Sequence, residues 1–65
     1  MKTYYIQAVV YPKGIEQVME FGLLVTADSL TDGLVTFQEH YEAQWGVGIT
    51  YTVTQVVDVE NGKLV

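Results

Sequence analysis

The side chains that could carry acid–base or metal chemistry gather in residues 29–42. His40 is the only histidine and the chain has no cysteine, so the usual ligand set of a zinc site is incomplete. Asp32, Glu39 and Glu42 could serve proton transfer, but carboxylates in that role are usually partly buried and face a partner group. Helical spacing places these three on an outer surface instead. We therefore interpret them, and His40, as a solvated surface.

Patterns for a nucleophile or a phosphate site are also missing. Ser29 has no base near it in the sequence and is better explained as a helix cap. The glycines are scattered singly and form no phosphate-binding loop. We expect no catalytic residue, no metal and no cofactor, and therefore no enzyme.

The suggestive group of side chains is aromatic and aliphatic, and it belongs to the first two predicted strands. Tyrosine is enriched in interface hot spots because its large rigid ring carries a polar tip. Two glutamates are included because an acidic hairpin would use them against a basic partner. The predicted interface residues are Tyr5, Val9, Tyr11, Glu16, Val18, Glu20 and Leu24. In the alternative interpretation, long neighbours such as Gln7, Gln17 and Glu20 cover this face and it binds nothing.

Hydrophobic periodicity predicts the elements that position these residues. Residues 3–11 alternate and are rich in aromatic and β-branched types, which is typical of a strand. Residues 12–14, PKG, predict a turn, because proline suits its first position and glycine tolerates positive φ. Residues 15–26 then return as a second strand.

The register of this hairpin is ambiguous from the sequence. A three-residue loop pairs Tyr11 with Ile15 and places Ile6 on the same face as Glu20. Matching apolar residues requires a two- or four-residue loop or a bulge. That match sets Tyr4, Ile6, Ala8 and Val10 beside Met19, Phe21, Leu23 and Val25. We favour the hydrophobic match.

A helix is predicted after the second strand. Ser29 can cap it, and Asp32 occupies the place of the glutamate in a capping box. Gly46 ends it. Gly33 costs about 1 kcal/mol relative to alanine, which close approach to the sheet would explain. The buried stripe at helical spacing is Leu30, Leu34, Phe37, Tyr41 and Trp45.

The C-terminal residues predict a third strand and the stub of a fourth. The third strand covers residues 49–59, and Asn61-Gly62 is a strong signal for a two-residue hairpin turn. This turn would pair Glu60 with Lys63 and Val59 with Leu64. The residues expected to point inward are Ile49, Tyr51, Val53, Val57 and Val59, and those expected to point outward are Thr50, Thr52 and Thr54.

The predicted architecture is one ββαββ domain over residues 1–65, of the α+β class. It has a single-layer, mostly antiparallel sheet of three long strands plus a short fourth, with one helix packed on one face. A right-handed crossover gives the strand order 2-1-3 with the stub outermost. Because both faces are apolar and one helix covers only one of them, the uncovered face must meet water or a partner.

Charge and length limit the partners. Eight acidic residues stand against three lysines, and arginine is absent, so direct nucleic-acid binding is not expected. The apolar runs are short and alternating, which excludes a membrane-spanning segment. The N-terminal residues show no secretory pattern, so we expect a cytoplasmic location. The expected partner is a protein with a basic surface, or a second copy of the chain.

The segment VTADSLTDGLVTFQEHYEAQWG, followed by a strand and VENGKLV, resembles small phage- and prophage-encoded ββαβ proteins. The resemblance covers residues 25–65 and is one of architecture, not of a functional motif. Some proteins of that kind, including anti-CRISPR proteins, block bacterial defence. The resemblance implies a phage-encoded inhibitor of a host protein such as a CRISPR–Cas component, acting in the bacterial cytoplasm. The acids here form no double row, which argues against DNA mimicry.

Three classes of function follow from these observations. The first is a protein-interaction module that self-associates, for example as a homodimer, or inhibits a host protein. The second is a small-ligand binder lined by Tyr41, Trp45 and Tyr51, or a structural phage protein. The third is a very small enzyme, for which no base or nucleophile is found.

Overall fold

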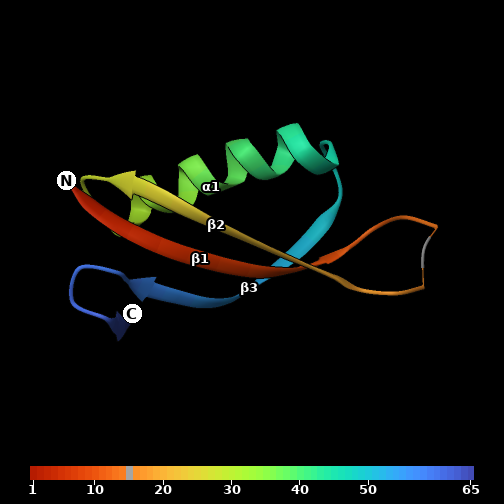
Figure 1. Cartoon of the computed structure of the whole chain (residues 1–65). Coiled ribbons are helices and arrows are strands. Elements are labelled where there is room, and N and C mark those ends of the chain that lie inside the picture. The colour runs from red at the N-terminus through yellow and green to blue at the C-terminus, as the bar shows by residue number, and fades with distance from the viewer. Residues whose placement is uncertain (15) are drawn as a thin grey trace.

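The computed structural model describes residues 1–14 and 16–65, which form four strands and one helix. The elements are β1 (Lys2–Tyr11), β2 (Met19–Ala27), α1 (Leu30–Trp45), β3 (Thr50–Asp58) and β4 (Lys63–Leu64). The strands make one antiparallel sheet in the order β2-β1-β3-β4, and α1 lies across one face of it (Figure 1). The predicted α+β fold of the ββαββ type and its strand order are confirmed.

The β1–β2 hairpin adopts the register that matches apolar residues. Tyr4 pairs with Val25 and Val10 pairs with Met19, so the hydrophobic alternative is confirmed. The second strand begins at Met19 and not at residue 15, which itself lies outside the described residues. Burial of the apolar side chains therefore decided the register, and the connection is longer than a tight turn.

The core lies between α1 and the covered face of the sheet. Phe37 and Tyr41 from the helix are buried against Ile6, Ala8 and Val10 of β1. Aromatic rings join three elements at one end of this core, with centroid distances of 4.3 to 6.4 Å among Phe21, Phe37, Tyr41 and Tyr51. The predicted stripe is confirmed, since Leu30, Leu34 and Trp45 also pack against the core.

The helix begins and ends where the sequence predicts. The Ser29 hydroxyl accepts a hydrogen bond from the Asp32 N–H at 3.2 Å, and the Gly46 N–H donates to the Glu42 carbonyl at 2.8 Å with φ of 97° at Gly46. Gly33 is buried, and a Cβ built there would lie 3.4 Å from both Tyr4 and Val25. The close approach of the helix to the sheet at Gly33 is thus confirmed.

A bulge in β3 turns the side chains of the second half of the strand to the faces opposite those predicted. The pairing with β1 shifts between Gln7 and Ala8, so that Ala8 pairs with Val53 and Gln7 with Gln55. The extra residue, Thr54, restarts the alternation one position later. Two valines predicted to point inward, Val57 and Val59, therefore do not face the core; Val57 pairs with Tyr5 on the uncovered face, and Val59 is 45% exposed. Val56 and Asp58 take their places.

The last hairpin is two residues off its predicted register. Lys63 pairs with Asp58 and Leu64 with Val57, whereas Glu60–Lys63 and Val59–Leu64 were expected. The reason is the buried Asp58, whose carboxylate accepts hydrogen bonds from the N–H groups of Glu60 and Asn61 and from the Asn61 side chain at 2.9 to 3.4 Å. These bonds stabilise a wider turn that closes at Gly62, with φ of 67°.

Candidate interaction surface

The face of the sheet opposite α1 is called the open face here. Strand register assigns every second residue to it, because side chains alternate along a strand. In β1, the side chains that face the helix are buried, namely Tyr4, Ile6, Ala8 and Val10. The side chains between them, Tyr5, Gln7 and Val9, are half-buried. Each strand therefore contributes to a surface on which no element of the described chain lies.

An apolar row crosses the open face through all four strands. Tyr5 of β1 pairs with Leu24 of β2 on one side and with Val57 of β3 on the other, and Val57 pairs with Leu64 of β4. Direct cross-strand partners have Cβ atoms about 5 Å apart, so the four side chains are in contact range. Leu24 is 63% exposed and Leu64 is 71% exposed. We call Leu24, Tyr5, Val57 and Leu64 the apolar row.

The hydroxyl end of the Tyr5 ring lies close to a neighbouring glycine. A Cβ built on Gly22 would fall 2.9 Å from the Tyr5 Cζ and still closer to its hydroxyl oxygen, so a larger residue there would displace the ring. Gly22 is the diagonal neighbour of Tyr5, because its direct partner is Gln7. The end of the ring thus lies over the backbone of β2 at Gly22.

Uncharged polar residues flank the apolar row on both sides. Thr3 and Thr26 form one neighbouring pair, with their hydroxyl oxygens 3.4 Å apart. On the other side Gln7 pairs with Gln55, and the Thr54 hydroxyl donates to the Gln7 carbonyl at 3.3 Å. An apolar centre with a polar rim is the usual composition of a protein interface.

The structure brings only part of the predicted interface together. Tyr5 and Leu24 are direct partners, and Val9 lies on the same face beside Glu20. Tyr11 is 44% exposed at the end of β1. Val18 and Glu16 are exposed, but they precede β2 and lie outside the paired strands.

Two members of the apolar row, Val57 and Leu64, were not predicted. Val57 follows another valine, so alternation alone does not say which of the two faces the helix. Leu64 depends on Val57, because the last hairpin carries it to the same face. The position of the bulge depends on how β3 pairs with β1, and the sequence of β3 alone does not contain that information.

The residues that could carry acid–base chemistry are scattered. Glu39, His40 and Asp32 are exposed, as expected for a solvated surface, whereas Glu42 is half-buried. Within residues 1–14 and 16–65, no group of three or more potential metal ligands is found. Burial raises the pKa of Tyr41 above its usual value, with further contributions from Tyr51 and Glu42.

The side chains proposed to line a ligand site between helix and sheet pack against one another. The Tyr41 and Tyr51 ring centroids are 4.3 Å apart, and the Tyr41 hydroxyl donates to the Ile49 carbonyl. The indole N–H of Trp45 is buried and meets no acceptor among the described residues. Tyr41 is part of the core, and Tyr51 and Trp45 pack against it.

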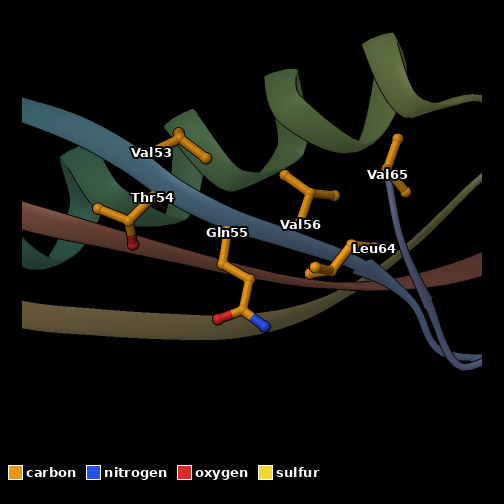
Figure 2. A pocket seen from close by; sticks show the side chains of 6 residues that line it. All are labelled: Val53, Thr54, Gln55, Val56, Leu64 and Val65. Atoms are coloured by element: carbon orange, nitrogen blue, oxygen red, sulfur yellow. The ribbon is translucent and has the colours of Figure 1, made fainter.

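A hollow of about 530 Å³ lies elsewhere, at the outer edge of β3. Its lining is Val53, Thr54, Gln55, Val56, Leu64 and Val65. Figure 2 shows Val53 and Val56 on the helix side of the strand and Gln55 on the opposite side. The hollow therefore borders the edge of the sheet, not the space under the helix.

In the described part of the chain, α1 falls short of the length and apolar character that crossing a bilayer requires. No protein-family model, curated protein or solved structure matches the sequence or the fold. The open face and the β3 edge therefore have to be interpreted from their own chemistry.

Proposed function

We propose that this chain is a non-catalytic interaction module that self-associates by packing the open faces of two copies against each other. The apolar row carries this proposal. Four apolar side chains in one line across four strands give a continuous strip that water solvates poorly. Two sheets packed face to face at about 10 Å interdigitate side chains in such strips.

The distribution of charge supports a second copy as the partner. Among the paired residues of the described strands, Glu20 is the one charged side chain that register places on the open face. Acids of the helix, such as Asp32 and Glu39, are exposed on the other side of the molecule. Two chains of net charge −5 can therefore meet face to face while most of their acids stay apart.

The area required also fits one face of the sheet. A standard interface buries about 800 Å² on each partner. That is roughly a fifth of the 4408 Å² accessible surface of this chain. A dimer therefore needs most of one side of the molecule, and the open face is the side that no element covers.

Sedimentation velocity at high micromolar concentration tests the proposal with Leu24→Glu. The glutamate places a charge in the middle of the row, and burying it unpaired is costly, so we expect monomers. Val35→Glu is the matched control, because Val35 is 52% exposed on α1, away from the open face. Circular dichroism should show unchanged helix content in both variants. A monomeric parent, or an equal effect of both substitutions, would contradict self-association.

The second candidate is a different protein with a basic surface, which the excess of acids supports. A host protein blocked by this chain, as the resemblance to phage-encoded inhibitors implies, belongs to this class. Association with a second copy and association with a basic partner respond to salt in opposite directions.

A further inference from the structure

The outer edge of β3 is largely unpaired. β4 pairs with Val57 and Asp58 only, and the Val65 N–H extends this ladder by one hydrogen bond, 2.9 Å long, to the Val56 carbonyl. Since β4 is the outermost strand of the sheet, no described strand pairs with this edge from Thr50 to Gln55. The backbone groups that point outward there are available to another chain.

This edge lacks the usual chemical protection against pairing. Sheet edges are commonly protected by lysine, other charges or proline. Residues 49–57 contain neither a charged residue nor a proline, and they are rich in threonine and valine. The bulge at Thr54 is the protective device that is present, and it limits a new ladder to a short one.

The hollow at this edge is lined by residues from both sides of the sheet. Register places Val53 and Val56 on the helix side, while Gln55 and Leu64 lie on the open-face side (Figure 2). A backbone lying in the plane of the sheet reaches both sets, because its own side chains alternate between the two sides. The helix side of the hollow is apolar, and the open-face side is partly polar.

We propose that the β3 edge binds an extended peptide segment as an added antiparallel strand, in line with β4. Main-chain hydrogen bonds from β3 supply the affinity. The preferred segment is uncharged and alternates, with small apolar side chains toward Val53, Val56 and Val65 and polar ones toward Gln55. The edge is separate from the apolar row except at Leu64, so this activity does not depend on self-association.

Two N-methylated peptides provide the test. The probe is acetyl-KTVTVTK-amide with a fluorescent label, in which valines alternate with threonines and the lysines maintain solubility. In one peptide, every second residue is N-methylated, which removes the N–H groups that face β3. In the other peptide, the residues between them are N-methylated, which changes only the edge of the added strand that faces away from β3. We expect fluorescence anisotropy to show that methylation of the N–H groups facing β3 weakens binding about tenfold or more, while methylation of the opposite edge leaves binding nearly unchanged. Equal binding of both peptides, or no binding of the unmodified probe, would overturn the proposal.

A protein variant locates the site. Val53→Glu introduces a charge into the hollow and should abolish binding of the probe, whereas Val35→Glu on the exposed side of α1 should not. The N-methyl comparison uses the parent protein, so the result stands even if Val53→Glu fails to fold. If Val53→Glu instead prevents self-association that Leu24→Glu leaves intact, the occupant of the edge is a second copy, and the peptide proposal is wrong.

Discussion

Single residues decide where the side chains of this sheet point. Thr54, the extra residue of the β3 bulge, moves Val57 onto the open face, and Gly22 leaves the space in which the Tyr5 ring lies. Asp58 sets the register of the last hairpin through its hydrogen bonds to the turn. The bulge and the last hairpin together bring the apolar row into one line.

Asp58→Ala should therefore destabilise the last hairpin. The substitution leaves the N–H groups of Glu60 and Asn61 without their acceptor, which costs about 1–2 kcal/mol by analogy with lost caps and hydrogen bonds. Asp58→Asn keeps one acceptor oxygen and should cost less. Urea unfolding midpoints measure both, with the exposed neighbour variant Glu60→Ala as the control, expected within about 0.5 kcal/mol of the parent. Equal midpoints for Asp58→Ala and Glu60→Ala would show that the carboxylate does not hold the turn.

At the scale of elements, one helix stabilises one half of the sheet. Its N-terminal cap, the close contact at Gly33 and the buried Phe37 and Tyr41 hold α1 on the covered face. The helix packs most closely on β2 and next on β1, so the β3 side has a thinner cover. This arrangement explains why Val53 and Val56 are only half-buried and why the hollow lies beside them.

The helix contacts should dominate the stability of the fold. Phe37 is fully buried and its ring lies 5.6 Å from Phe21 and 5.9 Å from Tyr51 by centroid distance, so Phe37→Ala should cost about 3–5 kcal/mol. Native domains are stable by only about 5–15 kcal/mol, and one this small is expected near the low end, so the variant should be largely unfolded. Glu39→Ala, on the exposed side of the same helix, should be nearly silent in the same denaturation experiment. If Phe37→Ala and Glu39→Ala both unfolded at the same denaturant concentration as the parent, this face of the helix would not form the core.

At the scale of the whole molecule, net charge and the apolar open face act against each other. A chain of net charge −5 repels its own copies at long range, and the repulsion is screened over about 8 Å at physiological salt. The apolar row acts only at contact. Association with a second copy and association with a basic partner therefore depend on salt with opposite signs.

Self-association should strengthen as sodium chloride rises from about 20 to about 300 mM, because screening weakens the repulsion between copies while the apolar contacts persist. Glu20→Lys, beside Val9 on the open face, should reduce this dependence more than Glu39→Lys on the helix. Dimer dissociation constants from sedimentation equilibrium provide the measurement. Dimer affinity that falls with salt would contradict the proposed repulsion between copies, and affinity that does not change would remove electrostatics from the account.

Local chemistry in the sequence was enough to predict the elements and their order. Alternation and β-branched residues mark the strands, Ser29 and Gly46 bound the helix, and the apolar spacing from Leu30 to Trp45 defines its buried face. These signals need only a few neighbouring residues, because capping and periodicity act within a few turns or strand positions. The strand order followed from the handedness of the crossover.

The pairing between strands was decided only by the tertiary structure. The bulge at Thr54 shifts β3 by a single residue, and a shift of one residue moves every following side chain to the other face. The wider turn around Asp58 moves the β4 pairing by two residues and leaves Leu64 on the same face as Val57. The free energy that selects such shifts comes from β1, Asp58 and the core together, which lie far apart in the sequence. For that reason Tyr5 and Leu24 could be predicted on the open face, whereas Val57 and Leu64, which complete the apolar row, could not.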